Sequence, residues 1–165
     1  MKIKRIAKHL LVTHGQVKRA FPPTALRVIE GVIKASEAEH TGEIRFVVEG
    51  GLDGMPLFKG QSARERAIEL FSQLRMWDTQ DNSGLLIYLL LADRAVEIVA
   101  DRGISAKVSL HEWSRICGEM ETAFKKSNFA TGVVGGVQAV THHLVTHFPA
   151  DGRSGNELPD KSVVL

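Results

Sequence analysis

Residues 78–103 read DTQDNSGLLIYLLLADRAVEIVADRG, and this stretch decides the fold. An acidic loop leads into an apolar run over residues 85–92. Asp93 and Arg94 then separate this run from a second, alternating segment over residues 95–100. Short runs rich in β-branched residues and bounded by turn formers are typical of strands, and two strands joined by a tight turn must be antiparallel. The stretch predicts a β-hairpin whose first strand, apolar on both faces, lies in the centre of a sheet.

The remaining chain alternates helical and extended patterns. Apolar residues at helical spacing predict five helices. They cover residues 2–20, 24–39 and 62–75, a segment opened by Ser109, and residues 128–147. A strand over residues 43–49, the helix over 62–75 and the strand over 85–91 form a right-handed crossover with parallel strands. Residues 50–60, with four glycines, are expected to be a loop. The expected fold is α/β: a three-layer α/β/α sandwich with a small mixed sheet and an extra N-terminal helix.

The pattern divides the chain into three segments. Residues 1–22 are predicted to be a basic amphipathic helix, residues 23–148 the α/β/α domain, and residues 149–165 a disordered tail rich in turn formers. The 165 residues fit one domain with a single core. The longest apolar run, residues 85–92, is less than half of the roughly 20 residues that a spanning helix needs.

The N-terminus and the cysteine content favour a cytoplasmic location. Lys4, Arg5 and Lys8 interrupt the N-terminal apolar residues, so no signal peptide is expected. Cys117 is the only cysteine and cannot form an internal disulfide, which fits a reducing compartment.

The formal net charge of +2 conceals an asymmetry. Residues 1–20 contain six basic and no acidic side chains, whereas the other 145 residues contain 15 basic and 19 acidic ones. The six basic residues are Lys2, Lys4, Arg5, Lys8, Lys18 and Arg19. One hypothesis is that the apolar stripe of this helix packs on the domain. The alternative is that it lies on an anionic membrane surface or a protein partner, with peripheral attachment to the membrane. Specific nucleic-acid binding is not expected, because no aromatic platform or recognition motif accompanies the charge.

The predicted topology places one group of polar residues before the second strand and after the third. Its members are Asp78, Asp81, Asn82 and Asp101. Carboxylate and amide oxygens are the ligands of hard cations such as Ca²⁺ or Mg²⁺, so a divalent-cation site is one hypothesis. The alternative is that these residues only form the turn, with Asp81 or Asn82 bonding to its own backbone.

A second group is expected at the carboxyl ends of the first two strands, where open α/β sheets usually bind ligands. Its members are Glu49, Asp53, Asp93 and Arg94. Glu49 and Asp93 could serve there as an acid–base pair. The alternative is that Asp93 and Arg94 form a polar hairpin turn. No established catalytic motif accompanies either group.

Four segments resemble, in order and spacing, the TPM domain family. They are EIRFVVE (43–49), DNSGLLI (81–87), DRAVEI (93–98) and DRG (101–103), and the resemblance extends over residues 24–147. It implies an α/β/α sandwich. It also implies relatives that include thylakoid-lumen proteins linked to photosystem repair and many bacterial proteins without assigned function. Some members are described as acid phosphatases, and some bind calcium in an acidic surface crevice.

The chain departs from the family pattern in three respects, the first being that neither the usual signal peptide nor the usual C-terminal membrane anchor is expected. The basic helix replaces an acidic segment, and the turn over residues 101–103 lacks the usual double glycine. The short form with a basic helix resembles a bacterial subgroup often labelled as membrane proteins.

Three functions are open. The favoured one is a non-enzymatic binding or accessory module with a calcium or magnesium site in its acidic loops. The alternatives are a metal-assisted phosphatase and a peripheral membrane or partner-docking module.

Overall fold

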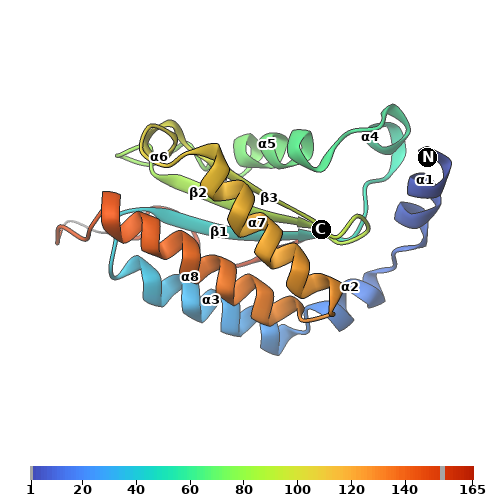
Figure 1. Ribbon diagram of the computed structural model, residues 1–165, viewed down its shortest axis with the longest axis horizontal. Coiled ribbons are helices and arrows are strands. Elements are labelled where there is room, and N and C mark those ends of the chain that lie inside the picture. The colour runs from blue at the N-terminus through green and yellow to red at the C-terminus, as the bar shows by residue number, and fades with distance from the viewer. Residues whose placement is uncertain (1, 153–154) are drawn as a thin grey trace.

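The computed structural model describes residues 2–152 and 155–165 (Figure 1). Its helices are α1 (Lys2–Leu11), α2 (His14–Ala20), α3 (Pro23–Glu37), α4 (Gly54–Lys59), α5 (Ala63–Gln73), α6 (Arg102–Ser105), α7 (Leu110–Lys125) and α8 (Phe129–His147). Its strands are β1 (Glu43–Glu49), β2 (Gly84–Leu90), β3 (Ala95–Ala100) and β4 (Val163–Val164). Within the described ranges, no helix combines the length and the apolar character that a membrane span requires.

The four strands form one mixed sheet in the order β3-β2-β1-β4. β1 and β2 are parallel, with Ile44 opposite Leu85, and the helix α5 connects them. β2 and β3 are antiparallel, with Ile87 opposite Ile98. The predicted crossover and the predicted hairpin are both confirmed. All seven residues of β2 are buried, as expected for a central strand covered on both faces.

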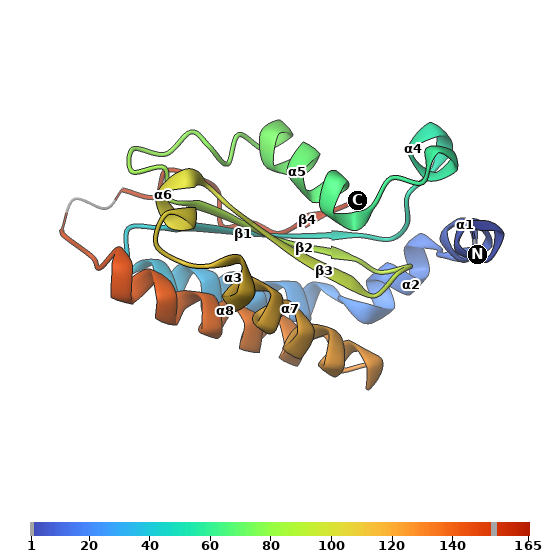
Figure 2. The same ribbon diagram turned by 45° about the horizontal axis from the view of Figure 1, so that its top comes forward.

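Helices cover both faces of the sheet (Figures 1 and 2). α3, α7 and α8 lie on one face, where Phe46 of β1 and Val140 of α8 belong to one buried cluster. α5 lies on the other face, where Val47 and Leu70 belong to a second cluster. Successive strand residues point to opposite faces, so one strand supplies both clusters. The expected three-layer α/β/α sandwich with a small mixed sheet is therefore confirmed.

The N-terminal segment contains two helices, so the prediction of one helix over residues 2–20 is wrong. α1 ends at Leu11, and Thr13 begins α2 as its N-cap. The Gln16 N–H donates to Thr13 Oγ1 at 3.3 Å, and the Thr13 N–H donates to Gln16 Oε1 at 3.1 Å. This capping box satisfies free N–H groups at a new helix start, which explains the break.

The C-terminal segment returns to the sheet, in contrast to the predicted disordered tail. β4 pairs with β1 in parallel, and Val48 lies opposite Val164. The Leu165 N–H donates to Val48 O at 2.9 Å. Two β-branched residues thus occupy the edge of β1 that would otherwise be free. Residues 153 and 154 of the predicted tail lie outside the described residues.

The predicted loop over residues 50–60 contains the short helix α4. Pro56 lies in its first turn, where a proline needs no N–H partner. Gly60 ends the helix with φ 79°, a left-handed conformation that favours glycine.

Candidate functional site

A crevice of about 490 Å³ opens where the end of α3, the start of β1 and the segment before β4 meet. Six carboxylates line it: Glu37, Glu43, Asp81, Asp151, Glu157 and Asp160. We call this set the acidic crevice. Among the described lining residues, Lys34 is the only lysine or arginine. The crevice lies at the end of the sheet where β1 begins, whereas α1 and α4 lie at the end where β1 leaves the sheet (Figure 1).

Two of these carboxylates are held by main-chain N–H groups. The Ile44 N–H donates to Glu37 Oε1 at 3.1 Å. Glu43 is 5% exposed and accepts from the N–H groups of Glu157 and Leu158 at 3.1 and 3.2 Å. These bonds fix the positions of the side chains and connect the C-terminal segment to the start of β1.

Burial raises the pKa of Glu37 to about 9, and the neighbouring Asp160 and Glu43 add to the rise against the hydrogen bond from Ile44. Burial also raises the pKa of Glu43, although two main-chain N–H groups lower it. Carboxyl groups in such surroundings bind protons more tightly than in water, because burial and the neighbouring acidic side chains disfavour their charged form. A cation bound beside them would offset the repulsion between these acidic groups.

His40 lines the crevice and is 1% exposed. The Gly42 N–H donates to His40 Nδ1 at 3.1 Å, so the neutral ring carries its proton on Nε2. Among the described residues, this Nε2 has no hydrogen-bond partner. Burial lowers the pKa of His40 to about 4, against the opposing effect of the Gly42 bond, so His40 adds no positive charge near pH 7.

The structure brings together three of the four residues predicted to bind a metal. Asp101 caps α6: the Arg102 N–H donates to Asp101 Oδ1 at 2.8 Å. The Gly103 N–H donates to Asn82 O at 3.0 Å, which places the loop of Asp81 and Asn82 against α6. A Cβ at Gly103 would lie 2.5 Å from Asp81 O, so this approach requires glycine. Asp81 also lines the acidic crevice.

Asp78 has a different partner. Its carboxylate forms an exposed ion pair with Arg75 at 2.9 Å. The four residues that the sequence predicts as ligands of one metal ion therefore do not form a single cluster of contacts.

The side-chain oxygen atoms of Asp101 and Asn82 differ in how well they suit a hard cation as ligands. Asp101 Oδ2 is buried and has no hydrogen-bond partner among the described residues, as a ligand atom would be. Asn82 Oδ1, however, accepts from Arg102 Nε at 3.2 Å, which places a positive charge beside it. Across residues 2–152 and 155–165, no three His, Cys, Asp or Glu side chains are arranged to hold one metal ion. Ca²⁺ also accepts main-chain carbonyl and amide oxygens, which the loop of Asp81 and Asn82 provides.

The second predicted group does not form an open acid–base pair. Glu49 accepts from both Arg66 Nε and Arg66 Nη2 at 2.9 Å, and Tyr88 Oη donates to it at 2.6 Å. Asp93 is bound by the N-terminal helix. Asp53 and Arg94 are exposed, and Arg94 adopts φ 52° in the hairpin turn. Both Glu49 and Asp93 therefore stabilise the fold through ion pairs, and acid–base chemistry by them stays a prediction.

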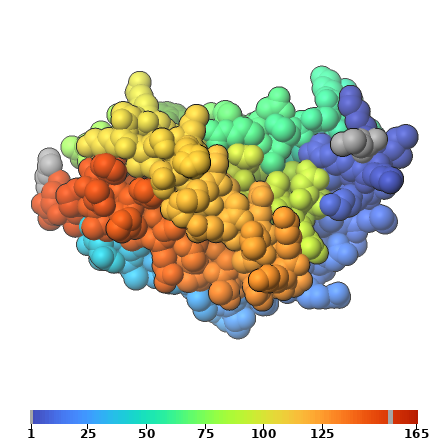
Figure 3. All heavy atoms as spheres, in the orientation of Figure 1, coloured from blue at the N-terminus to red at the C-terminus, as the bar shows by residue number. Residues whose placement is uncertain are grey.

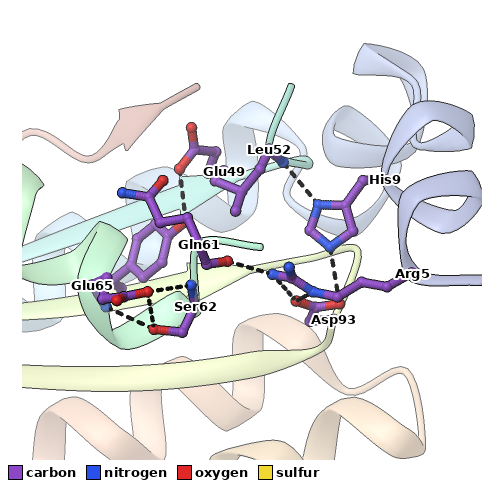
Figure 4. Close-up of polar contacts among 9 residues, drawn as sticks. Arg5, His9, Glu49, Leu52, Gln61, Ser62, Glu65 and Asp93 are labelled. Atoms are coloured by element: carbon purple, nitrogen blue, oxygen red, sulfur yellow. Dashed lines mark hydrogen bonds and ion pairs between the residues drawn. The ribbon is translucent and has the colours of Figure 1, made fainter. Parts of the chain in front are cut away.

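Asp93 connects the hairpin turn to α1 (Figure 4). Arg5 Nε donates to Asp93 Oδ2 at 3.0 Å, and His9 Nε2 lies 2.9 Å from Asp93 Oδ1. The Leu52 N–H donates to His9 Nδ1 at 2.9 Å, so Nε2 carries the proton that Asp93 accepts. Arg5 also donates to Gln61 O at 2.9 Å. We call the contacts of Arg5 and His9 with Asp93 the α1 latch. No local sequence pattern marks His9 as a site residue.

The six basic N-terminal residues are mostly free of ion pairs. Among the described residues, only Arg5 of this set has one. Val17 of α2 is 2% exposed, so α2 packs on the domain as the first hypothesis predicts. In α1, Ile6 packs against the second cluster, whereas Leu10 is 61% exposed. The first hypothesis therefore holds for α2 and in part for α1, and attachment of α1 to a membrane or a partner stays a prediction.

Comparisons with known proteins agree with this architecture. A family model described as the TPM domain matches residues 18–143. The NMR structure of the BA42 protein from the psychrophilic bacterium Bizionia argentinensis has a TM-score of 0.76 and 27% identity, over 86% of this chain and 93% of that chain. The solution NMR structure of an N-terminal domain from P. gingivalis has a TM-score of 0.61 and 24% identity, over 78% of this chain and 81% of that one. The second likeness concerns the fold alone. No curated protein matches the chain.

Proposed function

The chain belongs to the TPM domain family, and from this premise we propose that it is a non-enzymatic binding module whose acidic crevice takes a divalent cation, Ca²⁺ or Mg²⁺. One observation carries the proposal: six carboxylates line one crevice in which Lys34 is the only lysine or arginine described. A hard cation with oxygen ligands would offset this excess of negative charge.

Three residues have distinct roles in the proposal. Glu37 and Asp160 would neighbour the ion, because their mutual repulsion is relieved when a cation replaces a shared proton. Asp81 would complete the rim and connect the crevice to the loop against α6. Binding would then order this loop, and the ordered loop would be the surface that a partner recognises.

The test is a thermal unfolding series in EDTA, Ca²⁺ and Mg²⁺. A ligand that binds only the native state at 100 times its Kd stabilises it by about 2.7 kcal/mol, or several degrees in midpoint for a chain of this size. The wild type should show such a rise. Glu37→Gln and Asp160→Asn should lose it. Asp78→Asn is the matched control, because its carboxylate pairs with Arg75, and it should keep the rise.

Two outcomes would end the proposal. One is a wild-type midpoint that does not move at millimolar concentrations of either ion. The other is an equal rise in the wild type and in both crevice variants. Asp101→Asn tests whether the ion binds in the crevice or between α6 and the loop of Asp81 and Asn82. If this variant alone removed the rise in midpoint, the ion would bind beside that loop.

A metal-assisted phosphatase is the second candidate, favoured by one observation. Asp101 Oδ2 has no partner among the described residues and lies next in the chain to the cationic Arg102. An ion held there could activate water, with Arg102 binding a phosphate. Hydrolysis of p-nitrophenyl phosphate that needs a divalent ion and disappears in Asp101→Asn would support it. Equal hydrolysis by the variant would exclude this site.

A further inference from the structure

α1 contacts the domain through Arg5, His9 and the partly buried Ile6, and leaves a second, apolar face in solvent. Arg5 and His9 make the contacts of the α1 latch. Ile3, Ala7, Leu10 and Leu11 follow i, i+4, i+7, i+8 spacing and share another face of the helix. Ile3 is 82% and Leu11 72% exposed. A helix that only supports the fold would bury this face.

α4 lies beside α1 and adds to the same end of the molecule (Figures 1 and 2). Its Met55 and Phe58 are 62% and 59% exposed. These two helices carry five of the eleven large apolar side chains that the described residues expose: Ile3, Leu10, Leu11, Met55 and Phe58. We call this end, α1 with α4, the basic tip. In the space-filling view, α1 and α4 form one end of the long axis (Figure 3).

The basic tip is positively charged around its apolar side chains. Lys2, Lys4 and Lys8 of α1 are exposed, and none of them has an ion pair among the described residues. Asp53 before α4 and Lys59 at its end offset each other. The first acidic residue of the chain is Glu30, so the segment before it is free of negative side chains.

A groove of about 540 Å³ adjoins the tip between α1, α2 and the hairpin turn. Its charged lining residues are Lys8, Arg19 and Arg94, and none of the described residues that line it is acidic. Leu11 and Phe129 form part of its apolar wall. Cationic side chains beside apolar ones match an anionic headgroup joined to an acyl chain.

We propose that the basic tip docks on the surface of an anionic lipid bilayer, with the apolar face of α1 in the interface and its lysines at the headgroups. The charge of the tip argues for lipid rather than a second copy of the chain. A two-fold interface between two copies would bring together two patches that each contain Lys2, Lys4 and Lys8, where like charges repel. The acidic crevice, at the other end of the sheet, would then face away from the bilayer.

The α1 latch reduces the conformational entropy that is lost on this docking. His9 is 3% exposed and is held at both ring nitrogens. α1 is therefore held as a helix against the domain before it meets a membrane, and less conformational entropy is lost on binding than with a free segment. The proposal is independent of the cation site, because none of its residues lines the acidic crevice.

The test measures co-sedimentation of the full chain with vesicles of phosphatidylcholine alone and of phosphatidylcholine with phosphatidylglycerol. The wild type should bind only the anionic vesicles, and binding should weaken as salt rises. Leu11→Ser should weaken binding about tenfold, since one leucine no longer enters the interface. Lys8→Glu should weaken it about fivefold or more.

Matched controls separate docking from general effects of substitution. Leu110→Ser is the apolar control, because Leu110 and Leu11 are both 72% exposed. Lys161→Glu is the charge control, at an exposed lysine outside the basic tip. Both should bind as the wild type does, with unfolding midpoints that confirm an intact fold.

Three results would overturn the proposal. The first is no preference for anionic vesicles. The second is an equal loss in Leu11→Ser and Leu110→Ser. The third is a dimer, seen by sedimentation velocity without lipid, that Leu11→Ser dissociates, since the apolar face would then belong to a second copy.

Discussion

His9 Nε2 lies 2.9 Å from Asp93 Oδ1, although 84 residues separate them in the sequence. The contact joins the N-terminal helix to the hairpin turn (Figure 4). Asp93 is thus neither a simple turn residue nor a free acid at a sheet edge. It is the acceptor that holds α1 on the domain, together with its ion pair to Arg5 at 2.9 Å.

Asp93→Asn should release α1 while the domain stays folded. The substitution removes the charge that Arg5 and His9 share, and we expect a loss of about 2 kcal/mol for this partly exposed site. Hydrogen exchange of the α1 amides should accelerate, whereas the amides of β2 should not change. Asp53→Asn is the control, since Asp53 is exposed and makes no side-chain cap bond. Unchanged exchange in α1 would contradict the latch.

Acid should release α1 in the wild type. Burial alone would raise the pKa of Asp93, but the bonds from Arg5 and His9 outweigh it and lower the pKa below 3.8. The stability from this carboxylate is therefore present above about pH 3.8 and is lost as the pH falls through the lower folded value. In Asp93→Asn, the protection factors of the α1 amides, which correct for the intrinsic exchange rate, should not depend on pH in this range.

The sequence predicts most of the sheet because its signals are local. The hairpin and the crossover follow from the alternation and apolarity of residues 43–49 and 85–100. The break between α1 and α2 was missed, although Thr13 and Gln16 have the spacing of a capping box. β4 could not be predicted, because two valines form a strand only where β1 offers a free edge.

Of the six carboxylates that line the acidic crevice, only Asp81 is a candidate site residue from the sequence. The reason is that long-range contacts assemble the crevice. Glu43 binds the N–H groups of residues that are 114 and 115 positions away. No spacing pattern reports such a contact. The α1 latch was hidden for the same reason, since its partners are 84 and 88 residues apart.

Glu49→Gln should destabilise the domain by about 3 kcal/mol. Glu49 is 7% exposed and binds Arg66 through both carboxylate oxygens, so the variant leaves a partly buried guanidinium with only the exposed Glu69 as its charged partner. Tyr88→Phe should cost about 1.5 kcal/mol, because it removes only the hydroxyl that donates to Glu49. Urea unfolding measures both losses. A Tyr88→Phe loss larger than that of Glu49→Gln would mean that the hydroxyl, and not the ion pair, holds this site.

Mild acid should destabilise the protein through His40. Burial lowers its pKa from 6.5 to about 4, so between these values the unfolded chain binds a proton that the folded chain does not. Stability from this residue is thus complete above about pH 6.5 and falls as the pH approaches 4, by at most about 3 kcal/mol.

His40→Asn isolates this effect. The asparagine oxygen can replace Nδ1 as acceptor for the Gly42 N–H, and asparagine does not titrate. The difference in unfolding free energy between pH 7 and pH 4.5 should therefore shrink in this variant. His111→Asn, at an exposed histidine, should leave the difference unchanged. Equal pH profiles for wild type and His40→Asn would contradict the assignment.

Three glycine-to-alanine substitutions should change stability in different directions. At Gly84, a Cβ would overlap the main-chain carbonyl of Met76, which cannot move without displacing the loop before β2. We expect Gly84→Ala to cost about 3 kcal/mol or more. At Gly135 of α8, nothing lies within 4 Å of a Cβ. Gly135→Ala should therefore add about 0.5–1 kcal/mol through helix propensity.

The stability of Gly136→Ala should lie between the stabilities of Gly84→Ala and Gly135→Ala. A Cβ there would meet the Sδ of Met120, but a methionine side chain is flexible and can adopt another rotamer. Unfolding midpoints should follow the order Gly135→Ala, wild type, Gly136→Ala, Gly84→Ala. If Gly84→Ala were as stable as Gly136→Ala, the main-chain carbonyl of Met76 could not lie as close to residue 84 as the structure places it. Gly84, the first residue of β2, would then not be required for close contact between the two main chains.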